Sequence, residues 1–250
     1  MITLKDKVLL ITGAARGIGA ACARTGVRTG ARVVIVDVLE APLRELADEL
    51  GDSCQAIVGD LADPSAVPDL WARAMEWQDR IDVLINNAGI YEPASVDDAP
   101  DAWLRSWQRT LAINLVSPGV LCREAVRSFR ETGGGTIVNV ASRAAFRGED
   151  PEYMHYAASK AGVVAMTRTI ARMFGRDGIV AVAIAPGFVR TELNRVFFDR
   201  RGVDAAAAET ALGAIAEPQD IANTIIFIAS GLARHATGAT WDLNGASYVR

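Results

Sequence analysis

Two side chains one helical turn apart, Tyr156 and Lys160, have the chemistry to move a proton. Residues four apart on a helix lie on the same face, so the phenol and the ammonium come within reach of each other. An ammonium beside a phenol favours the phenolate, because an opposite charge stabilises the ionised form. A free tyrosine has a pKa near ~10, and lowering it to about neutrality requires roughly 4 kcal/mol of differential stabilisation. The pair predicts a general acid or base that works near neutral pH.

Other polar residues favour this interpretation over a solvated helix face, which a Tyr-x-x-x-Lys spacing alone usually marks. Ser142 ends a strand-length apolar run, and its hydroxyl can hydrogen-bond the oxygen of a carbonyl or of an alcohol. Asn114 lies in a long helical pattern, about 101–129, that also contains Pro118. Proline lacks the N–H that would bond the Asn114 carbonyl, so we expect a kink that leaves this carbonyl free. A kinked helix without a role is the alternative.

Two neighbouring residues are weaker catalytic candidates. Tyr153 is a second phenol, but the residue four positions later is Ala157 rather than a lysine, which favours a pocket wall or a packing residue. His155 adjoins Tyr156 but points roughly 100° away around the helix, so we expect it at the surface.

Strand-length apolar runs alternate with helical patterns along the whole chain, and these elements must position the polar residues. The runs are nearly continuously apolar, as expected for a parallel sheet buried on both faces. The expected strands are 8–12, 32–37, 54–59, 83–86, 136–141, 180–185 and 239–243, and the expected helices are 17–29, 42–50, 64–77, 100–130, 157–175 and 218–230. Strict alternation predicts an α/β fold, a single Rossmann-type domain over residues 1–250 with a doubly wound, seven-stranded parallel sheet and helices on both faces.

A glycine-rich turn follows the first expected strand and opens the first expected helix. It reads Thr12-Gly13-Ala14-Ala15-Arg16-Gly17-Ile18-Gly19. Glycines there allow a tight turn and close backbone approach to a pyrophosphate, and the helix N-terminus presents free N–H groups to the phosphates. A tight strand–helix loop without a ligand is the alternative, and the position of the turn after a strand favours nucleotide binding.

Together these motifs resemble the short-chain dehydrogenase/reductase family. The resemblance rests on the T-G-x-x-x-G-x-G turn, on Asn86-Asn87-Ala88-Gly89 after the fourth strand, and on Tyr156 with Lys160, and it covers essentially the whole chain. Enoyl reductases and extended epimerase-type members carry different spacings, so the similarity is to the branch of about this length. The resemblance implies an enzyme that transfers a hydride between a nicotinamide cofactor and a secondary alcohol or ketone.

The resemblance also implies a role for each matching residue. Ser142 would bind the substrate oxygen, Tyr156 would give or take the proton, and Lys160 would lower the pKa of Tyr156 and hold the nicotinamide ribose. Asn114 would hold a water that links Lys160 to solvent. The implied cofactor contacts are Gly13, Arg16, Gly17, Ile18, Gly19, Asp37, Asp60, Leu61, Asn87, Ala88, Gly89, Tyr156, Lys160, Pro186, Gly187, Val189 and Thr191.

Asp37 and Arg16 favour different cofactors. Asp37 ends the second strand, where a carboxylate can bind both adenosine ribose hydroxyls and so favours NAD. Against the 2′-phosphate of NADP it would make a like-charge contact of about 4 kcal/mol per unit charge at ~4 Å. A basic residue at the position of Arg16 occurs in NADP-using relatives, although Arg16 could simply pair with Asp37. We expect NAD, with NADP as the alternative; Asp60 is an adenine contact or an exposed helix cap.

The substrate is left open by the sequence. The segment 188–216 is expected to form a small lid, as it usually does in the family. Three arginines in it, at 195, 200 and 201, would attract an anionic substrate, but a solvated helix face is the favoured interpretation. The expected pocket residues are Phe146, Tyr153, Phe188, Leu193, Phe197 and Phe198. Polyols, hydroxy acids, steroids and 3-oxoacyl thioesters all fit.

Composition excludes several other classes. A formal charge of −4 gives no reason to expect nucleic acid or an anionic membrane as a partner, and no apolar run approaches the ~20 residues of a membrane span. The first expected strand begins at residue 8, so we expect no signal peptide. Three widely spaced cysteines fit reduced thiols, and two histidines make a Cys/His zinc site improbable. We therefore expect a cytoplasmic, metal-free protein.

Two functions of different classes remain as hypotheses. The favoured one is an NAD-dependent alcohol dehydrogenase or ketoreductase, with an NADPH-dependent 3-oxoacyl-[acyl-carrier-protein] reductase as the alternative within the enzymes. The other class is a nucleotide-sensing binding protein on the same fold. A protein that had lost catalysis would be under no pressure to keep Asn114, Ser142, Tyr156 and Lys160 together, which favours the enzyme. The resemblance further implies a homotetramer.

Overall fold

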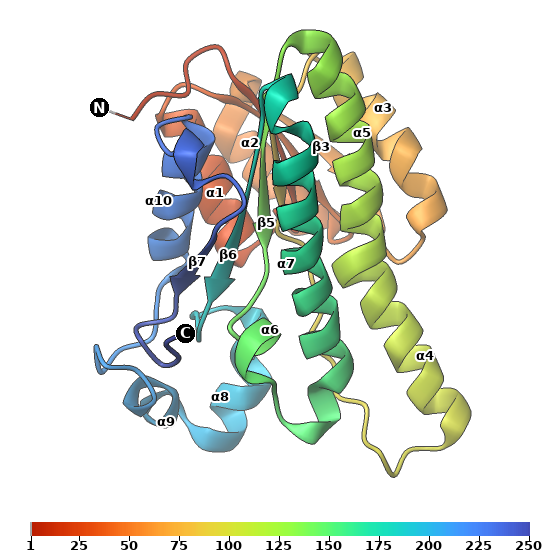
Figure 1. The fold of residues 1–250 in the computed structure, drawn as a ribbon, viewed down its shortest axis with the longest axis vertical. Coiled ribbons are helices and arrows are strands. Elements are labelled where there is room, and N and C mark those ends of the chain that lie inside the picture. The colour runs from red at the N-terminus through yellow and green to blue at the C-terminus, as the bar shows by residue number, and fades with distance from the viewer. Residues whose placement is uncertain (1) are drawn as a thin grey trace.

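A seven-stranded, wholly parallel sheet forms the centre of the molecule in the computed structural model, which describes residues 2–250 (Figure 1). The spatial order is β3-β2-β1-β4-β5-β6-β7. The strands are β1 (Val8–Thr12), β2 (Arg32–Asp37), β3 (Cys54–Val58), β4 (Val83–Asn86), β5 (Gly135–Val140), β6 (Ile179–Pro186) and β7 (Thr240–Leu243). The predicted fold class is confirmed.

Helices cover both faces of this sheet (Figure 1). On one face lie α1 (Gly17–Arg28), α2 (Glu40–Leu50) and α10 (Pro218–Ala229). On the other face lie α3 (Val67–Glu76), α4 (Pro100–Leu111), α5 (Ser117–Thr132) and α7 (Met154–Phe174). Three short helices, α6 (Ala144–Arg147), α8 (Arg195–Arg201) and α9 (Val203–Ala208), lie near the carboxyl ends of β5 and β6.

The core consists of two apolar layers, because alternate residues of each strand point to opposite faces of the sheet. In β1, Leu9 and Ile11 pack with the layer under α1 and α10, whereas Val8 and Leu10 pack with the layer under α3 and α5. Both sets are fully buried. This two-sided burial is the reason why the strands read as continuous apolar runs in the sequence.

The strand order reverses between β1 and β4, and the loops that follow these two strands diverge there. Asn87 ties the two loops together: its Nδ2 donates to the carbonyls of Thr12 and Gly13, both at 3.0 Å. The Thr12 hydroxyl in turn accepts from the backbone N–H groups of Asn87 and Ala88 at 3.1 Å. Ligands of doubly wound folds bind in the crevice at this reversal.

Several elements differ from the expectation. The helices at 144–147, 195–201 and 203–208 were not predicted, and α7 begins at Met154 rather than at residue 157. The predicted kink near Pro118 takes the form of a π-helical segment, Ala112–Val116, between α4 and α5. No helix in the described part of the chain is long and apolar enough to cross a membrane.

Candidate active site

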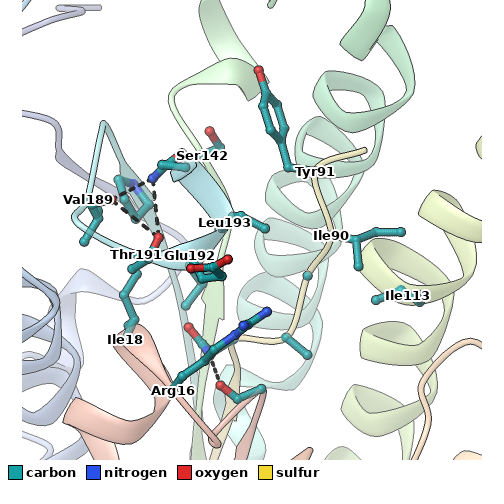
Figure 2. A pocket seen from close by; sticks show the side chains of 18 of the residues that line it. Arg16, Ile18, Ile90, Tyr91, Ile113, Ser142, Val189, Thr191, Glu192 and Leu193 are labelled. Atoms are coloured by element: carbon teal, nitrogen blue, oxygen red, sulfur yellow. Dashed lines mark hydrogen bonds between the residues drawn. The ribbon is translucent and has the colours of Figure 1, made fainter. Parts of the chain in front are cut away.

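A cavity of about 340 Å³ opens at the carboxyl ends of the strands. The segment that follows β6 lines one side of it. Figure 2 shows Arg16 and Ile18 at one end of this cavity and Ser142 and Tyr91 at the other. Thr191 and Glu192 lie along the wall between the two ends. The glycine-rich turn and the residues expected to transfer the proton therefore border one continuous space.

The glycine-rich turn leaves room only for bare backbone. Gly13 has φ +65°, and a methyl group on it would stand 2.7 Å from the Cα atom of Ala88. Gly17 has φ +57°, and a methyl group there would meet the Thr191 side chain at 3.2 Å. The N-cap residue of α1, Arg16, makes no side-chain capping bond, so the first N–H groups of α1 remain available to an anion. This cradle fits the pyrophosphate of a dinucleotide.

Asp37 stands at the end of β2 and is held firmly by backbone donors. Its two carboxylate oxygens accept from the N–H groups of Ala15 and Leu39, each at 3.0 Å. Arg16 is exposed, borders the cavity, and forms no ion pair with Asp37 in the described chain. The suggestion that Arg16 simply pairs with Asp37 is therefore wrong. Backbone N–H groups bind the carboxylate instead, and the Arg16 guanidinium remains available to a ligand.

Almost all of the predicted cofactor contacts border the cavity. They are Gly13, Arg16, Gly17, Ile18, Asp37, Asp60, Leu61, Asn87, Ala88, Gly89, Tyr156, Lys160, Pro186, Gly187, Val189 and Thr191. Gly19 does not border it and lies behind the turn, where a methyl group would stand 2.2 Å from the Gly13 carbonyl oxygen. Asp60 accepts from the Ala62 N–H at 2.8 Å and caps a turn rather than a helix, since the next helical turn is capped by Asp63.

Ser142, Tyr156 and Lys160 gather at the other end of the cavity. Tyr156 and Lys160 lie one turn apart on α7, with the ammonium nitrogen 5.7 Å from the centre of the phenol ring. Lys160 donates to the Val140 carbonyl at 2.8 Å, and Ser142 accepts from the Ala144 N–H at 3.1 Å. Three segments that are distant in sequence thus bring a hydroxyl, a phenol and an ammonium to one place.

Burial shifts both ionisable groups toward their neutral forms. Burial raises the pKa of Tyr156 to about 12, and the Ser142 hydroxyl only partly offsets this rise. Burial also lowers the pKa of Lys160 to about 8. The expected depression of the phenol pKa by the ammonium is therefore not seen here, because desolvation of the phenolate dominates and the charge of Glu149 acts in the same direction.

Asn114 lies in the π-helical segment, behind the cavity wall. Its side-chain oxygen accepts from the Ile90 N–H at 2.9 Å, and its amide nitrogen donates to the Ile90 carbonyl at 3.0 Å. The same nitrogen lies 3.3 Å from the Ser159 hydroxyl on α7. A methyl group on Gly89 would contact both the Asn114 oxygen, at 3.3 Å, and the Lys160 nitrogen, at 3.4 Å. Asn114 is thus next to Lys160 without touching the cavity.

The predicted substrate residues divide into two groups. Phe188 and Leu193 border the cavity, whereas Phe146, Tyr153, Phe197 and Phe198 do not. Phe197 packs on Phe188 with 4.3 Å between ring centres. Tyr153 stacks on Tyr91, with ring centres 3.8 Å apart, so it backs the wall rather than forming it. The arginines at 195, 200 and 201 are exposed and pair with carboxylates of their own surface.

Three residues that the motifs did not identify also border this end of the cavity. Tyr91 presents its ring edge-on to Tyr156 with 4.7 Å between ring centres. Arg143 and Glu149 place opposite charges close to Ser142 and Tyr156. The only sequence signal for Arg143 is its position directly after Ser142; Tyr91 and Glu149 lie in loops without a recognisable pattern.

His155 is buried, and the expectation of a surface position is wrong. It is 1% exposed, and neither ring nitrogen has a hydrogen-bond partner in the described chain. The reason is that α4 packs along α7, so the face turned away from Tyr156 meets Trp107, with 5.7 Å between the two ring centres. Burial lowers the pKa of His155.

This histidine should make the stability of the fold depend on pH. The unfolded chain takes up the proton below pH ~6.5, while the buried ring resists it, so the free energy of unfolding should fall as pH decreases below that value. The slope from this one group should stay below roughly 1.4 kcal/mol per pH unit, the limit for a full proton, and should level off once the folded ring is protonated as well. Urea unfolding between pH 5 and 8 would measure it.

His155→Phe preserves a ring of similar size and should remove this contribution to the slope. The matched control is the exposed His235→Gln, which should keep the wild-type slope. Equal pH slopes for the wild type and His155→Phe would contradict the expectation.

Known proteins resemble this chain over its whole length. The family model described as enoyl-(acyl carrier protein) reductase matches residues 13–245. The D-threitol dehydrogenase of Mycolicibacterium smegmatis is 36% identical over 250 residues, which cover 99% of this chain and 95% of that protein. The L-rhamnose 1-dehydrogenase (NAD(P)(+)) of Azotobacter vinelandii is 36% identical over 255 residues, with 98% of each chain covered.

A solved structure agrees with these sequence matches. The 3-ketoacyl-(acyl-carrier-protein) reductase from Brucella melitensis, complexed with NADH, superposes with a TM-score of 0.90 at 29% identity. The match covers 99% of this chain and 100% of that one. The similarity therefore extends to every element that borders the cavity.

Proposed function

The chain belongs to the short-chain dehydrogenase/reductase family, and we propose that it transfers a hydride between NAD(H) and a secondary alcohol or ketone. The observation that carries this proposal is the meeting of Ser142, Tyr156 and Lys160 at one end of a cavity whose other end is a bare-backbone turn. The four-residue spacing from Tyr156 to Lys160 favours carbonyl reduction over enoyl reduction, because enoyl reductases carry a different spacing.

Each residue has a defined task in this proposal. The nicotinamide, when bound, supplies or accepts the hydride. Ser142 binds the substrate oxygen by its hydroxyl, and Tyr156 exchanges the proton with that oxygen. Lys160 lies against Gly89 and the β5 terminus, where its ammonium can hold a ribose hydroxyl as well as the Val140 carbonyl. Asn114 acts through Lys160 and Ser159, so it is a positioning residue.

The protonation state of Tyr156 favours its action as an acid. With a pKa of about 12, the phenol carries its proton at neutral pH and can donate it to a carbonyl oxygen during reduction. In the oxidative direction the same oxygen must first release that proton, and the neighbouring ammonium of Lys160 would stabilise the phenolate. Ser142 also favours the phenolate, whereas burial and the charge of Glu149 oppose it.

The direct test is a change in nicotinamide absorbance on a panel of alcohols and ketones, with NAD(H) beside NADP(H). Turnover on any member establishes the activity and the cofactor together. Tight NADH binding without turnover on the panel would instead support a nucleotide-sensing protein.

Asp37 supports NAD as the preferred cofactor. Asp37→Ala should shift the ratio of kcat/KM for NAD over NADP toward NADP by at least about tenfold, because it removes a negative charge from beside the adenosine ribose. Asp37→Asn removes the charge but keeps the size of the side chain; its single amide oxygen can accept from only one of the Ala15 and Leu39 N–H groups, which now bond to separate oxygens. Both variants should shift the ratio. An unchanged ratio in both would remove the basis for NAD.

One alternative has a specific observation in its favour. Arg16 is exposed, borders the cavity and is not paired with Asp37 in the described chain, so it is available to a 2′-phosphate. This supports an NADPH-dependent 3-oxoacyl-[acyl-carrier-protein] reductase; the Brucella structure is named as a 3-ketoacyl-(acyl-carrier-protein) reductase, although it is complexed with NADH. The dehydrogenases named for threitol and rhamnose are each 36% identical to this chain and the Brucella reductase is 29% identical, and similarity at these levels leaves the substrate open.

We also propose that residues 188–216 form a lid. The ion pairs from α8 to Asp150 and Glu152, at 3.5 and 3.9 Å, are exposed and weak enough to open, which supports a lid.

We further propose that the chain assembles as a homotetramer in the cytoplasm. Leu104 and Val116, on the outer side of α4 and the π-helical segment, are exposed apolar side chains that support assembly.

A further inference from the structure

The substrate end of the cavity contains a buried arginine that the hydride transfer does not use. Arg143 follows Ser142, borders the cavity and is 3% exposed. Its Nη2 donates to Glu209 at 2.9 Å, and its guanidinium carbon lies 4.3 Å from the centre of the Phe188 ring. Its Nη1 is buried and has no partner among the described residues. Buried donors are almost always paired, so this N–H group calls for an acceptor that the chain itself does not provide.

A carboxylate accompanies the arginine. Glu149 is largely buried and borders the same cavity, and one of its oxygens accepts from Arg147 at 3.1 Å. Its charge acts on both Arg143 and Tyr156, which places the carboxylate near the reacting end. The cavity therefore offers a strong donor and a strong acceptor close to the phenol.

The charges of the side chains grouped around Arg143 balance. Two arginines, Arg143 and Arg147, accompany two glutamates, Glu149 and Glu209. A substrate carboxylate can only accept hydrogen bonds, so it would satisfy Arg143 but stand beside Glu149. An apolar chain would leave the Nη1 group of Arg143 without an acceptor, at a free-energy cost. A hydroxyl both donates and accepts, and it suits the two groups together.

An aromatic wall completes the site. Tyr91 borders the cavity, stacks on Tyr153 with 3.8 Å between ring centres, and is thereby fixed in position next to Tyr156. A rigid aromatic ring offers a flat apolar surface at little entropic cost. Such a surface suits the C–H groups of a carbon chain whose oxygens point to the polar residues opposite.

We propose that the substrate is a neutral polyhydroxylated molecule, a polyol or an aldose, and that Arg143 and Glu149 bind its hydroxyl groups beyond the reacting carbon. This inference rests on the proposed function and names the substrate class of the same site. Arg143 and Glu149 are then specificity-determining residues, and Ser142, Tyr156 and Lys160 perform the chemistry on any alcohol that reaches them.

The test compares substrates that differ in the chemical groups beyond the reacting carbon. Nicotinamide-coupled rates should be measured with a four-carbon polyol, with 2-butanol, with a sugar-acid carboxylate and with an acetoacetyl thioester. The polyol should exceed 2-butanol in kcat/KM by at least about 100-fold, because a site built to bind hydroxyls rejects the analogue that lacks them. The carboxylate and the thioester should be poorer substrates than the polyol.

Variants then assign the discrimination to residues. Arg143→Gln should lower kcat/KM for the polyol by roughly 10- to 100-fold, mainly through KM, and change that for 2-butanol by less than about threefold. Glu149→Gln, on a separate loop, should act in the same direction and covers the case in which loss of the Arg143–Glu209 pair prevents folding. The matched control is Arg130→Gln, an exposed arginine on α5 away from the cavity, which should match the wild type.

The outcomes separate the two proposals. No turnover of any substrate with NAD(H) or NADP(H) would overturn the proposed function and this inference with it. Turnover that favours the thioester or the carboxylate over the polyol would leave the dehydrogenase intact and overturn the substrate class. Equal losses on the polyol and 2-butanol in both variants would also overturn the assignment, because they would indicate a structural rather than a recognition role.

Discussion

Tyr156→Phe should reduce kcat by at least about 10³-fold while leaving NADH affinity within about threefold of the wild type. The substitution removes only the hydroxyl that carries the proton. The ring keeps its volume, so its packing against Tyr91 should persist. Without that hydroxyl, no other phenol at this end is one turn from a lysine. Steady-state rates and an NADH fluorescence titration on the same preparation would measure both quantities.

The chain provides a matched control in Tyr153, which lies three residues before Tyr156 in the sequence. Tyr153→Phe removes the hydroxyl of a buried tyrosine that stacks on Tyr91 yet does not border the cavity, and it should keep at least about a third of the wild-type rate. Comparable losses in the two variants, or substantial turnover in Tyr156→Phe, would remove Tyr156 from the catalytic role.

Gly19→Ala should abolish measurable dinucleotide binding and destabilise the fold by about 3 kcal/mol or more. A methyl group at this position would stand 2.2 Å from the Gly13 carbonyl oxygen and 2.8 Å from both the Ala14 Cα atom and the Asn87 side-chain nitrogen. Backbone cannot yield as a flexible side chain can, so α1 must move away from the turn that cradles the pyrophosphate. The melting temperature should fall by roughly 6–12 °C for a chain of this size.

A second glycine-to-alanine change controls for the substitution itself. Gly175 has ordinary helical backbone angles, and a methyl group on it would meet nothing within 4 Å. Gly175→Ala should therefore leave NADH affinity unchanged and the melting temperature equal or slightly higher. Wild-type affinity and stability in Gly19→Ala would show that the turn adapts, and would contradict the tight packing described above.

The sheet was predictable because two-sided burial imposes long apolar runs on the sequence. β1, β2 and β4 have the predicted bounds, and the other strands differ by one residue at one or both ends. The sequence did not predict the helices after β6, because runs such as Val203–Ala208 are too short to show a helical period.

The parts of the site that the sequence did not reveal depend on contacts between distant segments. His155 was expected at the surface because its angle from Tyr156 is local information, whereas its cover, Trp107, comes from α4. The direction of the Tyr156 pKa shift has the same origin: Lys160 is visible four residues along the chain, but the burial that raises the pKa of Tyr156 is not. Pro118 predicted an interruption of the helix but did not predict that the interruption would be π-helical.

The π-helical segment also has a consequence for how this chain can vary. A wider turn holds an additional residue, which is the result that a one-codon insertion into a continuous helix would produce. The placement of Asn114 against Ile90 then depends on the number of residues between α4 and α5. The identity of the other side chains in this segment matters less. Loss of one residue between Asn114 and α5 would rotate Asn114 by about 100° relative to α5. Its amide would then point away from the loop that contains Ile90.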